Sequence, residues 1–393
     1  MSALDQIDLT ATAKRLKLAR ERAGIRQSDA AVGIGVARTT IVAIEQGQRR
    51  LRVNEIQQLA RLYGTTVNAL LHQESIHVDL APRFRKLANS SSAAADEAVK
   101  LLCNLASAEA ELENLLGVKR IRNFPPERPL LGGDLRAQAE QDSLELRQHL
   151  GLGVSPVPDI VTLLELELGV RVYIRRLDSM ISGLFAYDEA LGPCMLLNAN
   201  HPRDRRTQSA AHECGHFVSA RSDPDILHAD VSDGSREERY ANTFGRAFLM
   251  PARAVMQKFQ ETVMGSGILS RRHIIILAHF FGVSREAMVR RLEELSLTKD
   301  GTWDWFQANG GISDQQESQV LGDLNPLDVQ RLESDRPTTL RLNLLAAEAY
   351  RQELLSEGQL SHLLSLDHVE TRQILDSLLN EGKGADGVKI LPH

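Results

Sequence analysis

The stretch from His212 to His216 constrains the fold of this chain more than any other part of the sequence. Its two histidines stand four residues apart, so on an α-helix both imidazoles lie on one face and can bind the same cation. Glu213 would then point toward the open coordination position of that cation. Ala210 and Ala211, just before the motif, are typical of a buried helix rather than a solvated one. The pattern therefore predicts a buried metal-binding helix.

A catalytic zinc site needs a third protein ligand, and the sequence offers two adjacent candidates. Glu237 and Glu238 lie on the next expected helix, and only one of them can face the cation. We prefer Glu238, because Asn242 follows it by one helical turn and could hydrogen-bond a ligand. Glu237 stays the alternative. A zinc ion held in this way would lower the pKa of its bound water, and Glu213 would take the proton, so these residues predict metal-dependent peptide hydrolysis.

Further residues near the motif are candidates for smaller roles. Tyr187, His228 and Tyr240 could each stabilise the oxyanion. The run 194–199 is the candidate strand for binding an extended substrate by strand addition. Cys214, inside the motif, is expected to be a small buried hydrophobe rather than a redox-sensitive thiol.

Changes in hydrophobic period divide the chain into many helices and one short run of strands. Helices are expected at residues 13–23, 27–33, 38–46, 54–63, 93–116, 134–150, 159–168, 205–220, 237–249, 338–357, 361–366 and 369–379. Three runs, 170–176, 183–188 and 194–199, are typical of antiparallel strands, and residues 223–233 of a solvated loop. The expected fold is multidomain and mainly α, with one α+β catalytic domain.

The length of the chain and the positions of its glycines and prolines predict four domains. At 393 residues the chain exceeds what one hydrophobic core usually supports. We expect a helical bundle at 1–73, a helical linker at 74–130, the catalytic domain at 131–300 and a helical accessory module at 301–393.

Charge and composition indicate which partners to expect. The first 72 residues carry 11 Lys and Arg against 6 Asp and Glu, whereas the whole chain has a net charge of -6. The basic end is therefore the candidate for nucleic acid. No apolar run approaches the roughly 18 residues of a membrane helix, and no secretory signal is visible. Three widely spaced cysteines are typical of reduced thiols. We expect a cytoplasmic, nucleoid-associated protein without membrane contact.

The segment 24–47 resembles the helix-turn-helix of the phage-repressor (XRE) family, with Ala31 where two helices approach and Gly35 in the turn. The resemblance covers about residues 13–71 and implies that the helix at 38–44 enters the major groove of double-stranded DNA. It places Arg38, Thr39 and Thr40 near base edges and Gln27, Arg49 and Arg50 on phosphates. A homodimer is expected, because one copy binds DNA weakly. The alternative is a protein-binding bundle with a solvated basic face.

The sequence around the metal motif resembles the ImmA/IrrE family of metallopeptidases. The similar stretches are 205–216, Glu238-x-x-Ala241-Asn242-x-Phe244 and Phe248-Leu249-Met250-Pro251, within about residues 134–297. Gln208, where the family usually has an aromatic residue, and Cys214, where it has an aliphatic one, depart from the pattern. The resemblance implies a thermolysin-like fold, zinc as the metal with ions such as Mn²⁺ as possible substitutes, and a helix-turn-helix repressor as substrate.

Together these features predict a transcriptional regulator with zinc-dependent endopeptidase activity. It would cleave a helix-turn-helix repressor, in trans or in itself, in response to stress or another signal. The alternative is a DNA-binding transcription factor that uses the peptidase-like domain as a sensor or dimerisation domain without turnover. The sequence does not distinguish a toxin–antitoxin or phage-defence regulator from a transcriptional regulator with endopeptidase activity.

Overall fold

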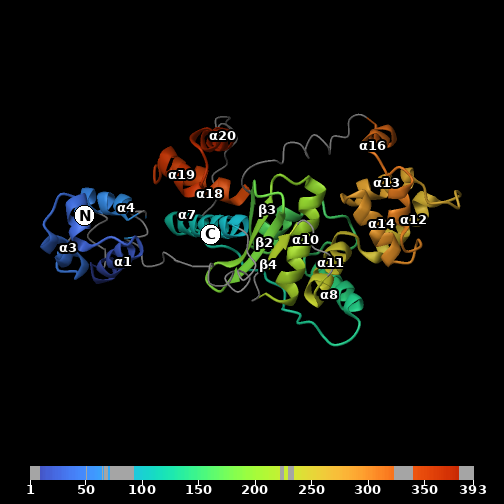
Figure 1. Cartoon of the computed structure of the whole chain (residues 1–393), viewed down its shortest axis with the longest axis horizontal. Helices are drawn as coiled ribbons and strands as arrows, with labels where there is room; N and C mark the ends of the chain where they lie inside the picture. Colours follow the sequence, from blue (N-terminus) through green and yellow to red (C-terminus); the bar gives the residue numbers. More distant parts are fainter. Residues whose placement is uncertain are drawn as a thin grey trace, which may run out of the picture.

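The computed structural model of the chain describes residues 9–49, 51–63, 65, 70, 93–221, 225–228, 234–322 and 340–379. These residues form many helices and one four-stranded sheet, so the expected mainly α fold with an α+β centre is confirmed (Figure 1). Among the helices described, none combines the length and the apolar character needed to span a bilayer.

The first four helices form a bundle with its own core. They are α1 (Leu9–Arg22), α2 (Gln27–Gly33), α3 (Arg38–Glu45) and α4 (Val53–Leu62). Leu16, Ile41 and Leu59 are buried in this core. Between α2 and α3 the chain turns at Gly35, whose φ of +67° is a conformation that favours glycine. The bundle matches the helices expected from the sequence.

The sheet is mixed, which corrects the expected antiparallel arrangement. Its strands are β1 (Arg171–Arg175), β2 (Ile181–Asp188), β3 (Gly192–Asn198) and β4 (Asp225–His228), in the order β1-β3-β2-β4. β2 and β3 form a hairpin, and β1 pairs in parallel with the far side of β3. Every residue of β1 and β3 is buried, because helices cover both faces of the sheet. Such two-sided burial gives continuous apolar runs, which carry no signal of strand direction.

Two expectations about strand edges were wrong. The run 194–199 lies almost entirely in β3, whose two edges are both occupied by β1 and β2, so it cannot receive a substrate strand. The expected loop 223–233 contains β4, which pairs with β2 and lies at the edge of the sheet as described. Four residues with an aspartate and a histidine are too few and too polar to give a strand pattern.

Helices cover both faces of the sheet (Figure 1). On one face lie α10 (Arg203–Ser219) and α11 (Arg236–Leu249), followed by α8 (Leu135–His149). A short α9 (Ile160–Thr162) continues into a π-helix (Leu163–Glu167) before β1, in place of the single helix expected at 159–168. The other face packs on α7 (Ala93–Leu116) and α18 (Leu340–Arg351).

The helix α7, expected inside a linker, forms part of this second layer. Its Leu102 and Leu105 are buried with Leu184 and Leu196 of the sheet. A buried ionic cluster joins α7 to three other segments: its members are Glu109, Glu113, Arg120, Arg171 and Arg341. The C-terminal helices α18, α19 (Glu357–Leu364) and α20 (His368–Leu379) share the same core. Residues 93–116 therefore do not stand free as a spacer.

A third group of helices follows α11 and contains a turn that repeats the one in the N-terminal bundle. It consists of α12 (Ala252–Val263), α13 (Arg271–Phe281), α14 (Arg285–Glu294), α15 (Thr302–Ala308) and α16 (Asp314–Leu321). Gly282, between α13 and α14, has φ +65°, and the N–H of Val283 donates to Ala278 O at 3.0 Å. In the α2–α3 turn the N–H of Val36 donates to Ala31 O at 2.9 Å. The two turns have the same local structure.

Candidate metal centre

Two glycines allow α10 and α11 to pack closely enough to share a site. A Cβ added at Gly215 would lie 2.9 Å from the Cα of Ala241, and one added at Gly245 would lie 3.1 Å from the backbone N of His212. Real Cβ atoms essentially never approach backbone to 2.9 Å. The contact brings the histidine face of α10 beside the first turn of α11, whose N-cap Ser235 accepts a hydrogen bond from the N–H of Glu238.

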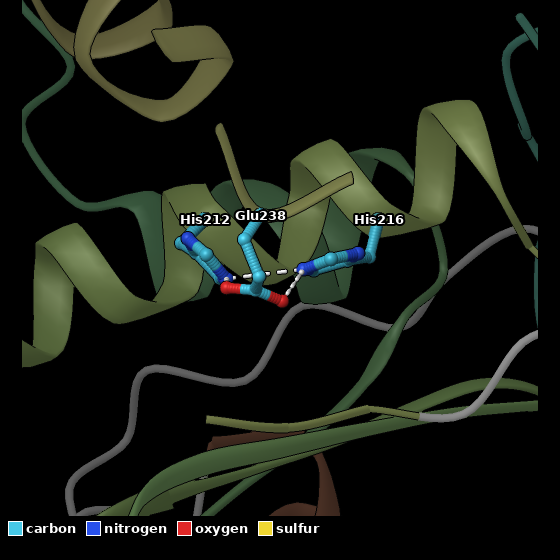
Figure 2. A group of neighbouring side chains, drawn as sticks. All are labelled: His212, His216 and Glu238. Atoms are coloured by element: carbon cyan, nitrogen blue, oxygen red, sulfur yellow. Dashed lines mark hydrogen bonds and ion pairs between the residues drawn. The ribbon is translucent and has the colours of Figure 1, made fainter. Parts of the chain in front are cut away.

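The side chains of His212, His216 and Glu238 converge at this contact (Figure 2). The Nε2 atoms of the two histidines are 3.0 Å apart. Nε2 of His212 lies 3.4 Å from Oε2 of Glu238, and Nε2 of His216 lies 3.3 Å from Oε1. Glu237, by contrast, is exposed, so of the two adjacent carboxylates only that of Glu238 joins the cluster.

This arrangement fits a tetrahedral cation. Zinc–ligand distances of about 2.0–2.2 Å place neighbouring ligand atoms about 3.3 Å apart. The two nitrogens are 3.0 Å apart, and each lies 3.3 or 3.4 Å from a different oxygen of the Glu238 carboxylate, so all three distances are close to that value. Two imidazole nitrogens and one carboxylate oxygen are also a donor set that zinc uses in catalytic sites. The residues present therefore fit the metal that the sequence predicts.

Asn242 lies behind the first histidine, at the position predicted for a supporting residue. Its Oδ1 is 2.9 Å from Nδ1 of His212. Because an amide oxygen only accepts, Nδ1 carries the proton and the lone pair of Nε2 faces the cluster. Burial disfavours the ionised carboxyl of Glu238, but hydrogen bonds and charge from His212 and His216 outweigh burial and hold its pKa well below the usual range. The carboxyl group of Glu238 is thus held in its ionised form, which is the form that binds a cation.

Glu213 lies between α10 and the sheet and is fully buried. A Cβ added at Gly183 of β2 would be 3.3 Å from Oε1 of Glu213. The absence of a side chain at Gly183 therefore leaves room for this carboxylate beside the strand. Sequence reasoning missed the part played by the three glycines, although glycines inside a helix or strand are a general signal of close approach.

Two other candidates have their contacts with residues outside the cluster. The hydroxyl of Tyr240 donates to Oδ2 of Asp142 at 2.7 Å, and burial together with that bond raises the pKa of Tyr240 well above its usual value. Tyr240 is therefore held by α8 rather than directed at a reacting carbonyl. The ring of Tyr187 packs edge-on against Phe124 and beneath Arg221. The side chain of His228 lies outside the described residues.

Burial raises the pKa of the Cys214 thiol to about 12, as expected of a buried hydrophobe rather than a reactive thiolate.

The residues predicted to contact DNA divide into two groups. Arg38 and Thr39 are exposed at the start of α3 and Thr40 is partly exposed, as a reading helix requires. Gln27 donates to Glu45 at 2.8 Å, and Glu45 also accepts from Arg20 at 2.7 Å. Arg49 donates to Glu55 at 2.8 Å. Both predicted phosphate contacts are thus engaged within the bundle, while Arg50 lies outside the described residues.

Replacing Gly215 by alanine is expected to lower the free energy of unfolding by about 1–3 kcal/mol, because the new methyl group overpacks the α10–α11 contact. In the interior of a helix, a change from glycine to alanine ordinarily raises the free energy of unfolding by up to about 1 kcal/mol. Gly358→Ala in α19 is the matched control, since its added Cβ would meet nothing nearer than 3.8 Å. Urea denaturation of both variants would show this difference. A more stable Gly215→Ala protein would contradict the packing argument.

Comparison with known families agrees with the two halves of this structure. Residues 166–293 match the model of the IrrE N-terminal-like domain of the M78 peptidases, and residues 12–73 match that of a helix-turn-helix domain. The chain thus joins an XRE-like helix-turn-helix domain to an ImmA/IrrE-like peptidase domain, as the resemblance predicted. No curated protein matches the chain. Among solved structures, ComR from Streptococcus suis matches over 95% of both chains with 8% identity and a TM-score of 0.16, which is too low to inform the fold.

Proposed function

We propose that this protein is a transcriptional regulator with zinc-dependent endopeptidase activity, which cleaves a helix-turn-helix repressor in trans or in itself in response to stress or another signal. The observation that carries the proposal is the convergence of His212, His216 and Glu238 at ligand-like distances. The second support is the presence of a peptidase-family domain and a helix-turn-helix domain in one chain. We further propose that it acts in the cytoplasm, at the nucleoid, as a homodimer on double-stranded DNA.

Each residue of the site would have a separate role in metal binding or proton transfer. His212, His216 and Glu238 hold the cation, and Asn242 fixes the ring of His212 in the tautomer that binds metal. Bound Zn²⁺ would activate water and polarise the scissile carbonyl; other divalent ions such as Mn²⁺ could replace it. Glu213 takes the proton from the attacking water and returns it to the leaving amine. Its buried position favours proton transfer, because no bulk water competes for the carboxylate.

The sheet offers a place for an extended substrate. β4 is the edge strand beside β2, among the residues that the structure describes, and β2 itself packs on α10. An edge strand presents unpaired backbone groups to which a polypeptide can add. We propose β4 in place of β3 as the strand that aligns the substrate.

Incubation of the purified chain with Zn²⁺, alone and with candidate helix-turn-helix repressors, tests the activity. Fragments are followed by mass spectrometry, and a chelator-treated sample is the control. Metal-dependent fragments of a repressor, or of the chain, are expected. If no fragment depends on metal, the peptidase-like domain acts as a sensor or dimerisation domain without turnover.

Replacing Arg38 by alanine is expected to weaken binding to the specific operator by about 1–3 kcal/mol, because an exposed arginine at the start of the reading helix contacts a base edge. The matched control is Arg26→Ala, an exposed arginine just before α2. Operators selected from random duplexes, followed by titrations at several salt concentrations, provide the measurement. Equal loss of affinity for operator and random DNA would assign Arg38 to phosphate instead.

A further inference from the structure

A cavity lies beside the start of α10, and its lining includes none of the three residues of the metal cluster. Its volume is about 890 Å³, within the range of about 300–1,000 Å³ of cavities that bind ligands. One wall consists of residues 156–159 and the start of α10, and the other of the α13–α14 turn with two residues of α16. Thr207 of this cavity precedes His212 by five residues, which places it roughly 7.5 Å along the helix axis and almost half a turn around it.

Both walls of the cavity are anchored to the C-terminal end of α11. The guanidinium of Arg147 is fully buried and donates to Gly153 O at 2.9 Å, to Ser155 O and to Phe248 O. It thereby fixes the loop that leads into the first wall. Arg291, also fully buried, donates to Met250 O at 2.9 Å and fixes α14 on the opposite side. The cavity is therefore a built feature of the fold rather than a gap between loosely placed segments.

The lining combines apolar surface with excess negative charge. The lining contains four carboxylates and two guanidinium groups, so it has a formal excess of two negative charges. The carboxylates belong to Asp159, Asp204, Asp314 and Glu317, and the guanidinium groups to Arg203 and Arg285. Arg285 is occupied, since it donates to Asp314 at 2.6 Å and lies 3.3 Å from Glu317. Phe280 is 41% exposed, and its ring already lies 4.7 Å from the ammonium of Lys258. An acidic lining with an exposed ring suits a ligand that carries both cationic and apolar groups.

The same observations argue against nucleic acid as the occupant. The α13–α14 turn repeats the α2–α3 turn, so Arg285 stands three residues after Gly282 as Arg38 stands three residues after Gly35. At α14, however, the arginine is neutralised by two carboxylates, and Glu286 follows where α3 has Thr39. A phosphate backbone would be repelled from this lining. The α13–α14 turn therefore has the local structure of the α2–α3 turn, but its surroundings are acidic instead of basic.

We infer that this cavity is an exosite for a basic, apolar segment of the polypeptide substrate. The inference rests on the proposed function in one respect, namely that the bound polypeptide is the one presented to the metal centre. An extended chain advances about 3.3 Å per residue, so on the order of five residues would span from the cavity around α10 to the metal centre. A basic helix-turn-helix protein has the complementary charge, as does the N-terminal part of this chain itself.

Binding of a fluorescein-labelled hexapeptide of alternating Phe and Arg to the zinc-loaded full-length Glu213→Gln protein tests the inference by fluorescence anisotropy. We expect binding that is at least about fivefold weaker after Asp204→Lys and after Phe280→Ser. Asp96→Lys is the matched control, because Asp96, like Asp204, lies in the first turn of a long helix. It should leave the affinity unchanged. Removing the metal should also leave it unchanged, which separates the cavity from the metal centre.

Three results would overturn the exosite. A Phe–Glu hexapeptide that binds as tightly as the Phe–Arg peptide would remove the charge argument. Unchanged affinity in both cavity variants, with circular dichroism confirming that they fold, would place the peptide elsewhere. Duplex DNA whose binding falls in Phe280→Ser while peptide binding does not would assign the cavity to nucleic acid. None of these readings depends on cleavage, so an inactive peptidase would leave the test of the exosite intact.

Discussion

Replacing Glu213 by glutamine is expected to slow metal-dependent cleavage by about 10²–10⁴-fold, the usual contribution of a positioned general base. Glutamine keeps the shape of the side chain in its buried place beside Gly183 but cannot take a proton from water. Glu213 is outside the cluster formed by His212, His216 and Glu238. The variant should therefore retain zinc, measured by elemental analysis after dialysis, while its rate of fragment formation falls.

Glu237→Gln is the matched control for this experiment, because it makes the same chemical change at an exposed carboxylate one residue from the cluster. Its rate should equal that of the unmodified chain. A loss smaller than about tenfold in Glu213→Gln would remove this residue from proton transfer. Loss of zinc from the same variant would show that the substitution slows cleavage by removing the cation instead.

The local part of the candidate site was predictable from sequence because its information lies within two helices. The four-residue spacing of His212 and His216 and that of Glu238 and Asn242 depend only on helix geometry. The structure has α10 at Arg203–Ser219 and α11 at Arg236–Leu249, each start within two residues of the expected one. The choice between Glu237 and Glu238 followed from Asn242, and in the structure Asn242 does lie against His212.

Non-local pairing could not be predicted in the same way. Glu113 of α7 would ordinarily be assigned to a solvated helix face, yet it is buried by arginines that stand 7, 58 and 228 residues away in the chain. No window of sequence contains these partners together. The parallel pairing of β1 with β3 has the same cause, since it depends on the β2–β3 hairpin placing β3 beside β1. Buried charge and strand order are thus properties of the assembled layers.

Replacing Glu238 by alanine is expected to weaken zinc binding by at least about 100-fold, because it removes one of three ligands and leaves the two imidazoles without a counter-charge. Glu237→Ala should bind zinc as the unmodified chain does, since that side chain is exposed and does not belong to the cluster. Competition with a chromophoric chelator measures both affinities under the same conditions. The pair is informative because both variants shorten a glutamate in the first turn of α11, so effects on helix stability are alike. Zinc retained by Glu238→Ala and lost by Glu237→Ala would reverse the ligand assignment and require α11 to rotate by about 100° from its described position.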